Sequence, residues 1–300
     1  MRDDCAATRR RHIGDSLGPL TSSHQARLRS VTLRGWTALG QIGRTFVAGV
    51  VAVAVSGCAG GDRPTRVARD PLLRAQPVFL YGAADTTRPP RAVIFFFGND
   101  IGFWQPHRRL AASLARSQYA VAGFDLRPLL GSLPARGAIR DSAFIAAIEP
   151  IIARSRHELG ADSAPLIIAG HSLGAEIAIW TAAHACEPEV AGVLAMSPGS
   201  RSHLRVSVSD IMNGPEPTEP GSFAVADAVG DVPGDERIAV IRGTKDNLAR
   251  ADPVLMAAGG DRIERFSVLL AGHSLKGLTM AGFETRRAVD WLLGPPKATR

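Results

Sequence analysis

A serine in the pattern Gly-x-Ser-x-Gly is the chain's strongest indication of chemistry. Gly170, Ser172 and Gly174 form the pattern. The apolar run 165–169 before it is typical of a buried strand, and residues 175–185 after it carry apolar side chains at helical spacing. A serine on a sharp turn from strand to helix is presented to a substrate, as a nucleophile must be. We therefore expect Ser172 to be a nucleophile.

The same pattern occurs a second time at residues 14–18. This copy follows the arginine run 9–11 instead of a strand, and Pro19 directly after it argues against a helix at that point. We interpret the second copy as a coincidence.

A serine hydroxyl is a weak nucleophile until a base removes its proton, and the base needs a carboxylate that orients it. Asp246 comes shortly after the apolar run 237–241, and His273 follows the strand-like run 263–270. Both residues thus stand near the carboxyl end of a predicted strand. We predict that Asp246 and His273 complete a catalytic triad with Ser172. A turn-forming role for the aspartate and a surface position for the histidine are the alternatives.

Acyl transfer also needs two backbone N–H groups that stabilise the oxyanion. Leu173, directly after the nucleophile, should supply one of them, and Asn99, in the sharp turn 98–102, should supply the other. The alternative is that the glycines of this turn only permit its geometry. We assign no catalytic role to His171 or Ser274, because a side chain next to the nucleophile is expected to point away from the site.

Strand-like runs alternate with helix-length segments from residue 77 onward. This alternation predicts an α/β fold with a mostly parallel, doubly wound sheet and helices on both faces. Ligands of such sheets bind at the carboxyl ends of the strands. The predicted strands are 78–81, 92–97, 120–124, 165–169, 190–196, 237–241 and 263–270, and the predicted helices are 106–117, 140–159 with a kink or split at Pro150, 175–185 and 283–293.

The length and charge of the chain limit its functional class. Its 300 residues, 45% of them hydrophobic, suffice for one full domain with additional segments. The formal net charge is +7, but residues 1–57 hold eight of the 35 Lys and Arg and three of the 28 Asp and Glu, which leaves 27 and 25. This near balance predicts no nucleic-acid partner. Metal and cofactor motifs are absent, so we expect neither group.

The apolar run 46–55 is too short to span a membrane but suits the core of a signal peptide. It leads into the letters VSGC at 55–58, which resemble the lipobox of bacterial lipoproteins. That resemblance implies cleavage before Cys58, lipidation of its thiol, and a position on the outer membrane or the periplasmic side of the cell envelope. A buried segment with a chance cysteine is the alternative. With only Cys186 left besides the lipidated cysteine, we expect no internal disulfide.

The predicted organisation has three parts. A leader with the signal peptide covers 1–57, a lipidated tether covers 58–76, and the α/β domain covers 77–295. Within the domain, residues 197–236 interrupt the alternation after the strand-like run 190–196 and contain the turn-rich runs PEPTEPG and DVPGDE. We expect a small insertion over the strand ends, which is either one wall of a substrate pocket or a surface excursion.

Two segments of the chain resemble the VirJ and AcvB group of bacterial envelope proteins, which are similar to α/β-hydrolases. The group has a Gly- and Asp-rich turn that ends in Trp, a later Gly-x-Asp segment, and an elbow of the form Gly-x-Ser-x-Gly-Ala-(Asp or Glu). The matching residues are Gly98, Asp100, Gly102, Trp104, Gly123, Asp125, Ala175 and Glu176. The similarity extends over residues 90–293. It implies the α/β-hydrolase fold and exposure to the periplasm.

The chain departs from this group at Asn99, Ile101 and Phe103 in the turn, and the segment 271–277 lacks the second histidine and the acidic residues of the group. These differences bear on the substrate more than on the mechanism. Members of the group have been tied to hydrolysis of aminoacylated phosphatidylglycerol and to support of secretion.

Together these features predict a serine hydrolase of the cell envelope that cleaves carboxylic esters through an acyl-enzyme. The expected substrate is a small-molecule ester or a lipid ester, including the aminoacyl-lipid ester that the resemblance implies, and the lipid anchor makes the membrane a partner. The alternative is a non-catalytic accessory protein that uses the fold to support secretion or assembly.

Overall fold

The structure is a computed structural model that describes residues 62–294 except 135–136, 187–188, 212–213 and 235. The predicted leader, 1–57, and the predicted lipidation site, Cys58, lie outside the described residues.

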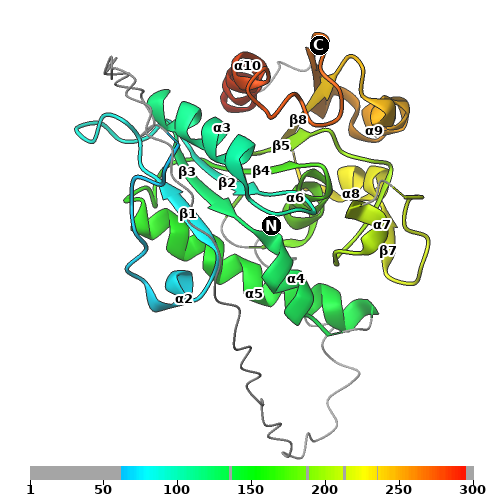
Figure 1. Ribbon diagram of the computed structural model, residues 1–300, viewed down its shortest axis with the longest axis horizontal. Coiled ribbons are helices and arrows are strands. Elements are labelled where there is room, and N and C mark those ends of the chain that lie inside the picture. Colours follow the sequence, from blue (N-terminus) through cyan, green and yellow to red (C-terminus); the bar gives the residue numbers. More distant parts are fainter. Residues whose placement is uncertain (1–61, 135–136, 187–188, 212–213, 235, 295–300) are drawn as a thin grey trace, which may run out of the picture. The chain divides into compact units, whose positions relative to one another are not determined.

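A seven-stranded sheet forms the centre of the described domain (Figure 1). The strands lie in the order β1-β3-β2-β4-β5-β8-β9, and all neighbours pair in parallel except β1 with β3. The mostly parallel sheet predicted from the sequence is therefore confirmed. The strands are β1 (Val78–Tyr81), β2 (Val93–Phe97), β3 (Ala120–Phe124), β4 (Leu166–His171), β5 (Gly192–Met196), β8 (Arg237–Gly243) and β9 (Ile263–Val268).

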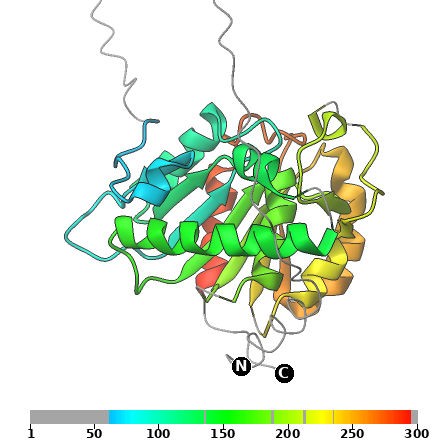
Figure 2. The same cartoon turned by 90° about the horizontal axis from the view of Figure 1, so that it is seen from below.

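Helices cover both faces of this sheet (Figure 2). The side chains of its strands alternate between the two resulting cores. In the fully buried strand β2, Val93, Phe95 and Phe97 belong to one core, whereas Ile94 and Phe96 belong to the other. Because each buried aromatic side chain contributes roughly 2–3 kcal/mol, the run of three phenylalanines fixes β2 in the middle of the domain. The first core includes side chains of α5 (Gly137–Glu158), α6 (Leu173–His184), α8 (Val225–Asp231) and α9 (Asp252–Gly259), and the second includes side chains of α3 (Gln105–Arg116) and α10 (Gly282–Leu293).

Helix α5 runs without a break through Pro150, so the split predicted there is absent. A proline inside a helix costs about 3 kcal/mol, because it removes one hydrogen bond and crowds the preceding turn. The neighbouring side chains Phe144, Ile148, Ile151 and Ile152 are at most 1% exposed and pack in the core. Their burial offsets the cost of the proline.

Residues 62–76 were expected to be part of a tether but pack against the domain. Leu73, in the short helix α2 (Pro71–Arg74), is buried in the core, and Arg66 forms a β-bridge with Leu80. The carboxylate of Glu158 accepts the Arg69 N–H at 2.9 Å. The boundary at residue 77 is therefore placed too late. The segment is mostly polar, so its composition did not indicate that its apolar side chain at position 73 is deeply buried.

The insertion at 197–236 has structure of its own. It contains α8, the short helix α7 (Val208–Ile211), and the antiparallel pair β6 (Arg201–His203) and β7 (Ser222–Ala224). His203 is buried in this segment and joins two of its turns, because its ring nitrogens lie 3.0 Å from Asp210 Oδ2 and 2.5 Å from Glu219 Oε1.

The described residues contain no helix that combines the length and the apolarity needed to cross a membrane. Cys186, just after α6, is disulfide-bonded. The expectation of no internal disulfide is therefore wrong.

Candidate active site

The turn between β4 and α6 holds Ser172 in a strained backbone conformation. Its φ of 55° and ψ of −126° lie in a region that L-amino acids rarely adopt. The two glycines of the pattern are required sterically. A Cβ on Gly170 would overlap the backbone of Gly174, and a Cβ on Gly174 would overlap the carbonyl of Gly98. The structure therefore contains the nucleophile elbow that the sequence predicted.

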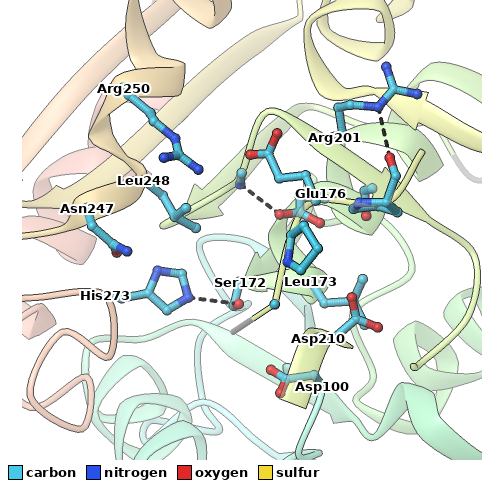
Figure 3. A pocket seen from close by; sticks show the side chains of 16 residues that line it. Asp100, Ser172, Leu173, Glu176, Arg201, Asp210, Asn247, Leu248, Arg250 and His273 are labelled. Atoms are coloured by element: carbon cyan, nitrogen blue, oxygen red, sulfur yellow. Dashed lines mark hydrogen bonds between the residues drawn. The ribbon is translucent and has the colours of Figure 1, made fainter. Parts of the chain in front are cut away.

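Tertiary folding brings Ser172, His273 and Asp246 together, and Figure 3 shows the contact between the first two. The distance between His273 Nε2 and Ser172 Oγ is 2.9 Å, so the hydroxyl can donate a hydrogen bond to the imidazole. On the other side of the ring, His273 Nδ1 lies 3.3 Å from Asp246 Oδ1. This second contact is poorly aligned, and Nδ1 has no well-formed hydrogen bond among the described residues. Such contacts are often loose in a free enzyme and tighten when substrate binds.

The carboxylate of Asp246 is buried and held by several donors. It accepts the Leu248 N–H at 3.0 Å and Arg242 Nη1 at 2.9 Å. Burial raises its pKa, but the close contact with His273 and the hydrogen bonds from Leu248 and Arg242 together lower that pKa below its ordinary value. Asp246 is therefore ionised and suited to stabilise a protonated His273.

Arg242 is a buried cation that sequence reasoning missed. It is completely buried at the end of β8 and donates to Asp246, to Asp252 Oδ1 at 2.7 Å and to the Pro198 carbonyl at 2.7 Å. The carboxylate of Asp252 is thus a second acidic partner of this guanidinium, besides Asp246. A charged residue directly after the apolar run 237–241 was the only signal in the sequence.

The two predicted oxyanion donors are on adjacent segments. The carbonyl of Gly98 packs against Gly174, which brings the turn after β2 next to the first turn of α6. Leu173 faces the cavity described below, and Asn99 is only 8% exposed. Asn99 does not line that cavity, whereas the next residue, Asp100, does. The turn is closed by a hydrogen bond from Gly102 N–H to Asn99 O at 2.9 Å.

A cavity of about 160 Å³ opens beside Ser172 (Figure 3). One wall comes from the insertion, as the pocket alternative had predicted, and the opposite wall comes from residues 247–250. Charged side chains dominate the lining; they are Asp100, Glu176, Asp210, Glu216, Arg201 and Arg250. The cavity therefore favours a polar group over a long hydrocarbon chain, because contact with a hydrocarbon would remove charged side chains from water at a cost in free energy.

Glu176 is the most deeply buried carboxylate of the cavity. It lies on the first turn of α6 and accepts the Gly199 N–H at 2.7 Å. Burial raises the pKa of Glu176 to about 7, and hydrogen bonding opposes this shift only in part. A substantial fraction of Glu176 is therefore protonated near neutral pH and can donate a hydrogen bond into the cavity.

His171 lies behind the nucleophile and outside the cavity lining, as expected. Sequence reasoning missed its contact with the main chain of the base, because His171 Nε2 is 3.1 Å from His273 O. Ser274 has no place in the cavity lining. Across the described residues, no group of three or more His, Cys, Asp or Glu side chains is arranged to hold a metal ion.

No protein-family model matches this chain, and no curated protein shows significant sequence similarity to it. Solved structures are similar in fold. A protein described as a dienelactone hydrolase from Klebsiella pneumoniae matches with a TM-score of 0.53 and 14% identity, over 70% of this chain and 90% of its own. Monoglyceride lipase from Saccharomyces cerevisiae matches with a TM-score of 0.51 and 13% identity, over 72% and 90%. Est1E from Butyrivibrio proteoclasticus gives 0.51 and 10%, over 72% and 92%.

Proposed function

We propose that this chain, which has the α/β-hydrolase fold, is a serine hydrolase that cleaves carboxylic esters. The observation that carries the proposal is the distance of 2.9 Å between His273 Nε2 and Ser172 Oγ on a strained elbow. Fold alone does not establish an activity. The proposal therefore depends on the arrangement of the hydroxyl, the imidazole and the buried carboxylate.

In the proposed mechanism, Ser172 Oγ attacks the ester carbonyl while its proton passes to His273 Nε2. Asp246 stabilises the imidazolium that forms, and the N–H groups of Leu173 and Asn99 stabilise the oxyanion. The alcohol then leaves with the proton from His273, and an acyl-enzyme remains on Ser172. A water molecule, deprotonated by His273, attacks this acyl-enzyme, and the acid leaves as His273 returns the proton to Ser172 Oγ.

The charged cavity supports an ester whose acyl group is short and polar. Its volume of about 160 Å³ is smaller than the roughly 300–1,000 Å³ that is typical of pockets for drug-sized ligands. If the substrate is a lipid, a polar part such as an aminoacyl group is expected to enter the cavity, while the hydrocarbon stays outside. An aminoacyl-lipid substrate, as predicted from the sequence, is compatible with the site if it binds in this way.

A fluorophosphonate probe tests the proposal directly. We expect the purified protein to be labelled and Ser172→Ala to remain unlabelled with an unchanged melting temperature. Absence of labelling in well-folded wild-type protein would show that the chain is a non-catalytic accessory protein, the alternative predicted from the sequence. Hydrolysis of short polar esters and of long-chain esters, compared under the same conditions, then tests the choice of substrate.

The proposed location is the cell envelope, with Cys58 as the lipid-bearing residue. The support is the lipobox-like sequence alone. Metabolic labelling with an alkyne fatty acid should tag the wild-type protein and leave Cys58→Ala untagged. Non-reducing mass analysis of the same samples should show which cysteine pairs with Cys186. A disulfide between Cys58 and Cys186 in the envelope fraction would contradict lipidation.

A further inference from the structure

Three histidine side chains from distant parts of the chain lie in a row behind the elbow. His107 is on the first turn of α3, His171 ends β4, and His273 follows β9. Ring centroids are 5.4 Å apart for His107 and His171, and 5.8 Å apart for His171 and His273. His107 is 0% exposed and His171 is 4% exposed, so water cannot satisfy their nitrogens. Every polar atom in this row therefore needs a protein partner.

The two outer partners determine where the protons of His107 and His171 are. His171 Nε2 faces the carbonyl of His273 at 3.1 Å, so it must carry a proton and donate it. His171 Nδ1 is then an acceptor in the neutral ring, and His107 Nε2 at 3.3 Å must be its donor. The remaining nitrogen, His107 Nδ1, accepts the Trp104 N–H at 3.3 Å. A single arrangement of protons thus satisfies all four nitrogens.

Burial keeps both inner rings neutral, as this arrangement requires. It lowers the pKa of His107 well below the ordinary value and that of His171 to about 4. A second proton on either ring would point a donor at another donor. His171, at one end of this pair, is thus a fixed, uncharged hydrogen-bond donor to His273 O.

The base itself has few other restraints. The contact between His273 Nδ1 and Asp246 is long and poorly aligned, and the side chain of His273 is 28% exposed. The loop that carries it contains four non-glycine residues with positive φ, namely Leu270, Leu275, Lys276 and Leu278. The hydrogen bond from His171 is therefore an anchor for the main chain of His273 at the point where the loop turns.

We infer that His107 and His171 are positioning residues, which hold the main chain of His273 so that its imidazole stays on Ser172. This inference rests on the proposed function, because it assigns the two residues a role in that reaction. The row also links three parts of the site: Trp104 ends the loop that contains Asn99, His171 precedes the nucleophile, and His273 is the base. The competing explanation is that the two histidines only fill space in the core.

Pairs of substitutions separate these explanations. In His107→Gln the amide nitrogen can still donate to His171 Nδ1, whereas His107→Leu fills similar space without a donor. His171→Gln can likewise still donate to His273 O, whereas His171→Leu cannot. His184→Leu is the matched control, because His184 lies on α6 and bonds the Trp180 carbonyl of its own helix.

The measurements are the rate of fluorophosphonate labelling, kcat and KM for a short ester, and the melting temperature. For both leucine variants we expect labelling and kcat to fall by about 10- to 100-fold, the loss that a misplacement near 1 Å produces, while KM changes little. Both glutamine variants and His184→Leu should stay close to wild type. Leucine variants that react at the wild-type rate would overturn the inference. It would also be overturned if, at the same position, the glutamine variant lost as much activity as the leucine variant.

A second measurement does not depend on activity. Nitrogen NMR of the imidazoles at neutral pH should show His107 and His171 as neutral rings protonated at Nε2, with resonances assigned by their loss in the glutamine variants. A proton on Nδ1 of His171 would refute the proposed arrangement of protons in the row, even if the enzyme is active. If wild-type protein is not labelled but shows this protonation, the proposed function fails while the hydrogen-bonded row stands.

Discussion

Replacing Arg242 by methionine tests whether a buried cation organises the acid of the site. The substitution keeps much of the side-chain volume but leaves the carboxylates of Asp246 and Asp252 without their shared partner. It also leaves the Pro198 carbonyl without its donor. Removing one member of a buried ion pair costs about 3–5 kcal/mol, because the remaining charge stays out of water.

The expected effect on the melting temperature follows from the size of the domain. For a domain of this length, each 1 kcal/mol corresponds to a shift of about 2–4 °C, so Arg242→Met should melt roughly 6–20 °C below wild type at neutral pH. The melting temperature of Arg242→Lys should lie between those of wild type and Arg242→Met, because an ammonium keeps the charge but cannot reproduce the planar set of donors. Arg250→Met, an exposed arginine on the neighbouring 3-10 helix, is the control and should melt within a few degrees of wild type.

The pH dependence gives an independent check. The folded state lowers the pKa of Asp246 below its value in the unfolded chain, so this group stabilises the protein above pH 4 and loses that contribution as the pH falls. Arg242→Met weakens the cause of the shift. The difference in stability between variant and wild type should therefore be largest at pH 7 and smaller at about pH 2, because the contribution is lost only as the pH falls well below 4 toward the lowered pKa of Asp246.

Thermal and urea unfolding at both pH values, together with the rate of fluorophosphonate labelling, measure these effects. We expect the labelling rate of Arg242→Met to fall at temperatures where the variant is still folded, because Asp246 loses one of its fixed donors. A melting temperature within 2 °C of wild type, which is below the effect of 1 kcal/mol, would refute the reasoning.

Other substitutions test single features of the site. Glu176→Gln removes a buried acid whose pKa is raised to about 7, and such a group lowers the stability of the wild type as the pH rises from about 4.5 to 7. In urea unfolding, the variant should be more stable than wild type by up to about 3 kcal/mol at pH 8 and by little at pH 4.5. A difference that does not depend on pH would contradict this. Gly174→Ala should abolish fluorophosphonate labelling and lower the melting temperature, since its methyl group would overlap the Gly98 carbonyl; a labelled, stable variant would show that the turn can relax. In a series of esters with increasing acyl length, kcat/KM should be highest for the shortest chains, because charged side chains line the cavity; a maximum at long chains would contradict that assignment.

The sequence predicted the seven strands of the main sheet, four of the helices and the three residues that meet at the elbow. Apolar runs of four to eight residues between breakers identified the strands, because a parallel sheet with both faces covered buries every side chain of its inner strands. Ser172, Asp246 and His273 could be proposed because parallel strands bring their carboxyl ends to one edge. This reasoning needs only local patterns and the general geometry of the fold.

Local pattern failed where long-range packing outweighed it. Pro150 predicted a break, yet α5 continues because its apolar side chains are buried in the core. Residues 62–76 looked like a polar tether, but Leu73 occupies the core and the backbone pairs with β1. In both cases the stabilising contacts involve residues that are far away in the sequence.

By itself the sequence determined the fold class and the candidate nucleophile, because periodicity and the Gly-x-Ser-x-Gly turn are local properties of the chain. Only the tertiary structure decided which groups surround the triad. The partners in the histidine row are 64 and 102 residues apart, and Arg242 reaches a carbonyl 44 residues away. Such contacts depend on side-chain direction after the layers have packed, and no spacing along the chain encodes that direction.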